Sequence, residues 1–215
     1  MAEQSIPPRG RRPYRMRRRL ESLEATRGRI TAATFELHAT IGPSRTTVRG
    51  IADRAGVQRH TVYAHFPDLA TLYLACTEHG IRVTGMPVPD AWLLIADSRV
   101  RLNTGLQDLF GWYRANESML RNVLYGVDLS APQPTEPDLF ERRMASIHEA
   151  LSAGWAVPDG VVSRTLDAVV AHAMAFETWR SLTANGLTDT QAVALLENIV
   201  AAVADGTLAP VRPAS

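Results

Sequence analysis

The segment from residue 46 to residue 66 constrains the fold most, because one glycine divides it into two short helical stretches. Apolar side chains share one face of the first stretch: Val48, Ile51, Ala52 and Ala55. Gly56 interrupts this pattern, and Val62 and Phe66 then supply the apolar face of the second stretch. Two short helices joined by a tight turn with Gly are typical of a helix-turn-helix, whose second helix enters the major groove of DNA.

Charge is distributed unevenly along the chain. Residues 1–65 hold thirteen arginines and five acidic residues, whereas the remainder holds ten arginines and seventeen acidic residues. This asymmetry favours a basic head that binds nucleic acid and an acidic body that DNA repels. All 23 basic residues are Arg, which fits either bidentate phosphate contacts or a GC-rich coding bias, and the coding bias is the stronger interpretation.

The first 20 residues form a basic segment with three prolines and almost no apolar side chains. This composition predicts an arm that is disordered when free of DNA. Beside a helix-turn-helix, such an arm is expected to follow phosphates or to enter the minor groove. The arginines expected to do so are Arg11, Arg12, Arg15, Arg17, Arg18 and Arg19. A solvated charge run is the alternative interpretation.

Beyond residue 20 the periodicity is helical, which predicts an all-α fold of two domains. We expect a DNA-binding domain with its connecting helix over residues 21–83, and a helical body over residues 84–215. The stretch TGMPVPD, residues 84–90, marks the junction. Body helices are expected at residues 91–115, 117–127, 137–155, 159–185 and 189–204, with a proline-rich loop over residues 131–137.

The last expected helix carries an apolar stripe that needs a partner surface. Its members are Ala192, Leu195, Leu196, Ile199, Val200 and Val203. The helix before it offers Leu166, Val169, Val170, Ala173 and Met174. We therefore expect the last two helices to form half of a four-helix bundle across a two-fold axis, as in a homodimer.

The motifs of common enzyme classes are missing. None of the six histidines has another at i+3 or i+4, and the sequence has no glycine-rich phosphate loop and no Gly-x-Ser-x-Gly. We expect no catalytic residues, no metal and no cofactor. Cys76 is the single cysteine, so no internal disulfide forms, and no apolar run approaches the length of a membrane span. A cytoplasmic protein without a secretory signal is expected.

The body also holds aromatic side chains with a few polar groups among them, the composition of a pocket for a small-molecule effector. The candidate pocket residues are Trp112, Tyr113, Tyr125, Phe140, Met144, His148, His172, Phe176 and Trp179. For each of them, an ordinary place in the core is the more frequent outcome.

The stretch TTVRGIADRAGVQRHTVYAHFPD resembles the DNA-binding head of TetR-type (tetracycline-repressor-like) regulators. The resemblance covers roughly residues 27 to 80. It implies a homodimeric, usually repressing transcription factor on a palindromic operator in double-stranded DNA, associated with the bacterial nucleoid, whose body binds a small molecule. Within this pattern Thr46 and Thr47 match phosphate-capping threonines, and Tyr63 and His65 match residues that contact the DNA backbone.

Gln58, Arg59 and His60 match the variable positions that open the recognition helix, where Gln and Arg can pair with base edges. The full set of expected DNA contacts is Arg45, Thr46, Thr47, Arg49, Gln58, Arg59, His60, Thr61, Tyr63 and His65. The chain departs from the pattern at Leu69, where a basic residue is common, and at His38 and Pro43, where aromatics are usual.

Two other classes of protein stay open. One is an effector-independent DNA-binding protein, either architectural or an activator, which would have a well-packed body without a pocket. The other is an enzyme on a helical scaffold, for which the sequence offers no acid, base or nucleophile set.

Overall fold

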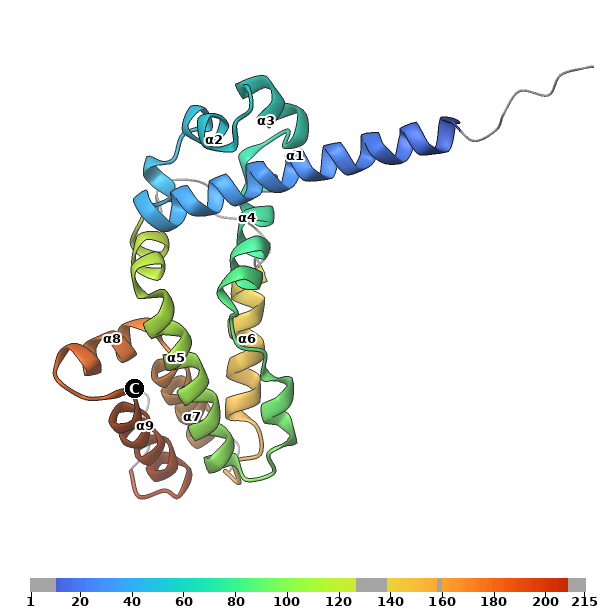
Figure 1. Ribbon diagram of the computed structural model, residues 1–215. Helices are drawn as coiled ribbons and strands as arrows, with labels where there is room; N and C mark the ends of the chain where they lie inside the picture. Colours follow the sequence, from blue (N-terminus) through green and yellow to red (C-terminus); the bar gives the residue numbers. More distant parts are fainter. Residues whose placement is uncertain (1–10, 127–138, 158–159, 209–215) are drawn as a thin grey trace, which may run out of the picture. The chain divides into compact units, whose positions relative to one another are not determined.

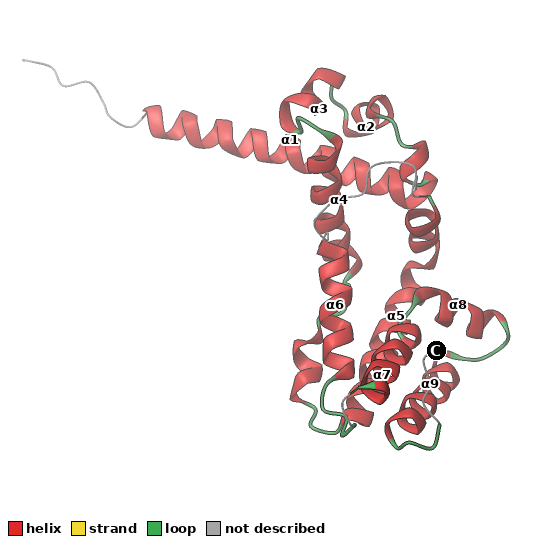
Figure 2. Ribbon diagram, turned by 180° about the vertical axis from the view of Figure 1, so that it is seen from behind, coloured by secondary structure: helices red, strands yellow, loops and turns green. Residues whose placement is uncertain are grey.

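The computed structural model describes residues 11–126, 139–157 and 160–208, and within these ranges every regular element is a helix (Figures 1 and 2). The expected all-α fold is confirmed. The α-helices and the two short 3-10 helices (η) are α1 Arg11–Ile41, η1 Pro43–Arg45, α2 Val48–Ala55, α3 Arg59–His65, α4 Leu69–Thr84, η2 Pro89–Leu94, α5 Ser98–Tyr125, α6 Leu139–Ser152, α7 Val161–Ala173, α8 Phe176–Ala184 and α9 Asp189–Ala204. No helix among the described residues is long and apolar enough to cross a membrane.

The chain divides into two compact units. The N-terminal unit comprises Met1–His79 and Asn122–Asp128, and the C-terminal unit comprises Gly80–Arg121 and Leu129–Ser215. The first boundary thus falls four residues before the expected one at residues 83 and 84. The last turn of α5 also belongs with the N-terminal unit, whereas we expected it in the body.

In the N-terminal unit, α1 packs mainly on α2, and α3 follows α2 after the turn at Gly56. The buried core of this unit is Ile30, Ala33, Ile51, Ala52, Ala55, Val62, Phe66 and Leu72. The apolar positions of residues 46–66 that defined the motif are therefore its core. They leave the other side of α2 and α3 to solvent.

Hydrogen bonds join the end of α5 to the last turn of α1 and to η1. Asn122 Nδ2 donates to the carbonyl of Ala39 at 2.7 Å, and the Ser44 amide donates to the carbonyl of Gly126 at 3.1 Å. The approach is close, since a Cβ on Gly126 would lie 3.1 Å from Pro43 Cδ. Asn122 thus caps free carbonyls at the C-terminal end of α1.

The core of the C-terminal unit is built around α5, with η2 and α6 packed closely against it. A Cβ on Gly105 would overlap Leu151 Cδ2 and would lie 3.2 Å from Trp92 Cε3, so glycine is what allows this approach. The Trp92 indole N–H donates to Asp108 at 2.8 Å. Elsewhere in the unit, α7 packs on α9, and α8 contacts both.

Two expected boundaries in the body were wrong, and a third was correct. The expected helix 159–185 is two helices, because Ala175 is extended (φ −69°, ψ 137°) and the Tyr113 hydroxyl donates to the freed carbonyl of Met174 at 2.6 Å. The break expected at residue 116 is confirmed, since α5 is kinked there and Asn116 has non-helical angles (φ −121°, ψ 15°). Residues 89–94, part of which was expected to open an α-helix, form the 3-10 helix η2.

Other expectations lie outside the described residues, among them the proline-rich loop at residues 131–137.

The final helix was correctly predicted, since α9 spans Asp189–Ala204 as expected. Thr188 caps it in a capping box with Gln191. Its stripe divides: Ala192, Leu196, Val200 and Val203 are buried within the chain, whereas Leu195 and Ile199 are 42% and 36% exposed.

Candidate nucleic-acid interface

Helix α2 is fixed at both ends by local backbone chemistry. The Thr47 hydroxyl accepts a hydrogen bond from the Gly50 amide at 3.1 Å, the standard N-cap arrangement. At the other end Gly56 takes left-handed angles (φ 64°, ψ 41°), which β-carbon-bearing residues adopt only at a cost. The turn between α2 and α3 is therefore well defined, and it sets where α3 begins.

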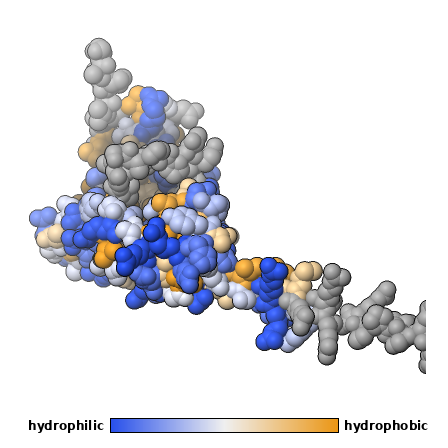
Figure 3. All heavy atoms as spheres, turned by 90° about the horizontal axis from the view of Figure 1, so that it is seen from above, coloured by the Kyte–Doolittle hydropathy of each residue, from blue (hydrophilic) through white to orange (hydrophobic). Residues whose placement is uncertain are grey.

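Helix α3 turns one face to the core and the other to solvent. Val62 and Phe66 are 2% and 1% exposed, so they hold the helix against the core of the N-terminal unit. The exposed face presents Gln58, Arg59, His60 and Tyr63, while Thr61 and His65 are half-buried. Figure 3 shows the molecule from above, and hydrophilic side chains dominate that view. An open depression of about 530 Å³ adjoins the exposed face of α3. It is lined by Arg49, Ala52, Asp53, Val57, Gln58, Arg59 and His60.

Two residues expected to contact DNA already have partners within the chain. The Thr46 hydroxyl donates to the carbonyl of Gly42 at 2.9 Å, and Arg45 Nε donates to the carbonyl of Ile41 at 2.7 Å. Both interactions order the connection between α1 and α2. Arg49 is exposed and lies 3.8 Å from Asp53, a loose ion pair between solvated groups that stabilises little.

The basic arm is partly helical. Helix α1 begins at Arg11 instead of near residue 21, so the expectation of a disordered segment was wrong for residues 11–20. Helix-favouring Arg, Met and Leu fill this stretch, its Pro13 sits in the first turn, and Arg17 pairs with Glu21 one turn on at 2.9 Å. Residues 1–10 and the side chains of Arg11, Arg12 and Arg15 lie outside the described residues.

Arg27 was missed in the sequence analysis. Its Nη1 donates to the carbonyl of His65 at 2.6 Å, and its guanidinium carbon lies 4.0 Å from the centroid of the Phe66 ring. The signal was present, because Arg27 stands three residues before Ile30 on the apolar stripe of α1. A charged side chain on an apolar stripe indicates a contact within the chain, but the sequence does not show which residue is the partner.

The candidate effector residues fall into two groups. Trp112, Tyr113, Phe176 and Trp179 are buried and pack ring against ring, with centroids 5.4–5.9 Å apart among the contacting pairs. Phe140 and Met144 pack against this core, and His148 Nε2 lies 2.9 Å from the carbonyl of Asp167. The structure does not bring His172 and Tyr125 into this group, because His172 is exposed and Tyr125 belongs to the N-terminal unit.

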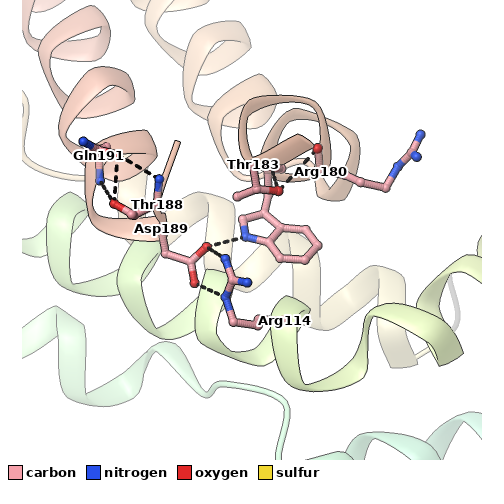
Figure 4. A network of polar contacts seen from close by, with 7 residues as sticks. Arg114, Arg180, Thr183, Thr188, Asp189 and Gln191 are labelled. Carbon is pink, nitrogen blue, oxygen red and sulfur yellow. Dashed lines mark hydrogen bonds and ion pairs between the residues drawn. The ribbon is translucent and has the colours of Figure 1, made fainter. Parts of the chain in front are cut away.

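One polar atom in this aromatic core stands out. Among the described residues, no group accepts a hydrogen bond from the buried Trp112 indole N–H. By contrast the Trp179 indole N–H donates to Asp189 Oδ1 at 2.8 Å, and Arg114 binds the same carboxylate (Figure 4). Within the described part of the chain, no group of three or more potential ligands is placed to hold a metal.

A capped α2, a glycine turn and an α3 with polar residues facing outward define a helix-turn-helix protein of the transcription-regulator class. Residues 30–76 match the family model described as "Bacterial regulatory proteins, tetR family". Over these residues the chain has the DNA-binding segment of the TetR family, as its resemblance implied. That family consists of regulators, which agrees with the expectation that the chain is not an enzyme.

Two known proteins are similar to this chain over longer stretches. The chain is 27% identical over 107 residues to the HTH-type transcriptional activator FasR of Mycolicibacterium smegmatis (strain ATCC 700084 / mc(2)155). The match covers 50% of this chain and 49% of FasR, so the chain spans about half the length of that curated relative. Among solved structures, RolR in complex with resorcinol has 15% sequence identity and a TM-score of 0.44, over 91% of this chain and 99% of that one.

Proposed function

We propose that this chain is a homodimeric, sequence-specific transcriptional regulator that binds a palindromic operator and is released from it by a small-molecule effector. The observation that carries the proposal is the outward face of α3. There Gln58 and Arg59 have the side chains that pair with adenine and guanine edges, and Tyr63 has a hydroxyl for the DNA backbone. The strongly basic N-terminal 65 residues add attraction to phosphate.

The arginines of the N-terminal part of α1 extend this interface in our proposal. Arg18 and Arg19 are exposed, as is Arg17 despite its pair with Glu21. Leu69 stands where a basic residue is common in the family and cannot bind phosphate, so α1 binds the DNA backbone in its place. A regulator of this kind works in the cytoplasm at the bacterial nucleoid.

The proposed dimer forms through α9 and the segment before it, residues 159–185, which comprises α7 and α8. Support comes from Leu195 and Ile199, which project from α9 beside a stripe already buried within the chain. Two-fold symmetry then presents two copies of α3 to successive major grooves. The proposed effector lies at the aromatic core of the C-terminal unit, where Trp112 offers an N–H donor and where Phe140 and Met144 pack against the core.

We propose that the chain represses transcription. The effector releases the dimer from DNA because it binds more tightly to the conformation in which the spacing of the two DNA-binding domains does not fit the operator. A second candidate is an activator, which the name of FasR as a transcriptional activator favours. The two differ in the transcription of a reporter gene behind the operator. Deletion of the regulator raises that transcription if it represses and lowers it if it activates.

A gel shift with the DNA upstream of the protein's own gene, titrated with salt, tests DNA binding. We expect saturable binding that survives nonspecific competitor, with log K falling linearly with log salt concentration. Arg59→Ala and Tyr63→Ala should lose operator binding and keep the dimer in light scattering, whereas Arg121→Ala, at an exposed position on α5, should bind as wild type. Unchanged binding by the first two variants would overturn the assignment of α3.

A further inference from the structure

The side chain of Arg27 closes over the C-terminal end of α3. Its Nη1 donates to the carbonyl of His65, the last residue of the helix, at 2.6 Å. The guanidinium carbon lies 4.0 Å from the centroid of the Phe66 ring, within cation–π range. Arg27 and α3 lie within the same compact unit, so one residue of α1 engages both residues that end the recognition helix.

Both contacts satisfy needs that a short helix cannot meet alone. Carbonyls in the last turn of a helix have no intrahelical donor, and a cation there is also favoured by the helix dipole. Helix α3 has seven residues and is therefore about 10 Å long, too short to be stable without tertiary contacts. Its orientation depends on what holds it from outside.

Three supports hold α3. The Gly56 turn fixes the end at which Gln58 and Arg59 open the helix, and Val62 and Phe66 fix the buried side. Arg27 is the polar contact at the opposite end. Without it only the apolar packing of Val62 and Phe66 resists a pivot of α3 about its first turn, and a pivot of about 10° displaces a helix of this length by roughly 2 Å at the far end. Base readout requires placement within about 0.5 Å.

We infer that Arg27 is a positioning residue for the recognition helix, one that orients α3 through His65 and Phe66 without contacting DNA itself. This inference rests on the proposed function, in which α3 reads the operator. Arg27 is exposed, but its donor Nη1 and the face of its guanidinium are both used within the chain. Arg29, two residues along α1, is also exposed and provides a matched control.

The test compares Arg27→Gln, Arg27→Lys and Arg29→Gln in the full chain. Amide hydrogen exchange of residues 62–66 is measured without DNA, and binding to operator and to nonspecific duplex is measured over a range of salt concentrations. For Arg27→Gln we expect exchange to accelerate by about tenfold and operator Kd to rise by about tenfold. Nonspecific Kd and the salt slope should stay as in wild type. Arg27→Lys keeps the charge and should restore part of both losses, and Arg29→Gln should leave exchange unchanged.

Two results would overturn the inference. One is unchanged exchange or unchanged operator affinity in Arg27→Gln. The other is an equal loss on operator and nonspecific DNA with the salt slope reduced by about 0.9, which identifies Arg27 as a phosphate contact instead. If the wild-type chain shows no preference for any operator, the proposed function fails. Hydrogen exchange still decides separately whether Arg27 holds α3.

Discussion

Arg114 on α5 holds the carboxylate of Asp189, the first residue of α9, through two hydrogen bonds of 2.6 and 2.5 Å (Figure 4). The Trp179 indole N–H donates to the same carboxylate, so one acidic side chain joins α5, α8 and α9. The hydrogen bond from Arg114 is the main cause that lowers the pKa of Asp189 below its usual value of 3.8. A lowered carboxyl pKa means that the ionised form stabilises the folded state.

Asp189→Asn is therefore expected to lower the melting temperature at pH 7, by a loss of about 1 kcal/mol, since the exposed Arg114 is partly screened by water. The stabilisation by the carboxylate is complete above pH 4 and is lost as pH falls through the lowered pKa of Asp189. The gap between variant and wild type in thermal melts should narrow below pH 4. A gap that does not change with pH, or one shared by the exposed control Asp90→Asn, would contradict this role.

His38 predicts a second pH effect, of a different kind. Burial lowers the pKa of His38 to about 4, and its Nε2 has no hydrogen-bond partner among the described residues. In the unfolded chain the His38 imidazole takes up a proton near pH 6.5, whereas in the folded chain it stays neutral down to about pH 4. The free energy of unfolding should therefore fall as pH drops from 6.5 to 4, by about 1.4 kcal/mol per pH unit.

His38→Phe keeps a ring beside Tyr73, whose centroid lies 5.0 Å from that of His38, and removes the titrating group. Thermal melts at pH 7.5 and pH 5 should show a smaller acid loss in this variant than in wild type. An equal loss in both proteins would mean that other groups cause the acid sensitivity.

Arg101 is a buried cation that neutralises no carboxylate in the described contacts. It is 5% exposed, and its guanidinium donates to the carbonyls of Ile95, Ala150 and Ala153 and to the Ser98 hydroxyl. Arg101→Met should cost about 3 kcal/mol, because it leaves buried carbonyls without donors. Chemical denaturation measures the loss, and Arg99→Met, at an exposed position on the same helix, should change stability far less.

Glycine substitutions test the turn before the recognition helix. An added Cβ at Gly56 meets no atom within 4 Å, so Gly56→Ala should cost about 1 kcal/mol through its left-handed angles alone. Gly28 lies inside α1 with equally open surroundings, and Gly28→Ala should stabilise by about 0.5–1 kcal/mol. Melting temperatures that move in the same direction for the two variants would contradict this explanation.

The sequence predicted those parts of the fold that depend on local signals. The bounds of α9 follow from the Thr188 cap and the stripe behind it, and the turn at Gly56 follows from the glycine. The break after Met174 had no such signal, since no Pro or Gly stands there and the tertiary contact from Tyr113 satisfies the freed carbonyl. The kink at Asn116, by contrast, lies where the sequence predicted a break between two helices.

The interface residues divide in the same way. The exposed side of α3 was predictable, because the buried positions Val62 and Phe66 fix which side faces outward. Arg27 and Asn122 were not predicted, because each acts on backbone carbonyls from a segment distant in the sequence. The hydrogen bonds of Arg45 and Thr46 are local, to carbonyls four residues earlier, and were missed because a pattern of residue types does not show which donors are already used.

Selection of binding sites from random duplex DNA with the full chain shows whether a dimer of this chain reads a DNA sequence. We expect enrichment of an inverted repeat whose half-site centres are one helical turn, or a multiple of it, apart. Arg59→Ala should change the selected bases at one position of each half-site. Enrichment of no sequence, or the same selected sequence with Arg59→Ala as with wild type, would contradict the claim that a dimer of this chain reads DNA through α3.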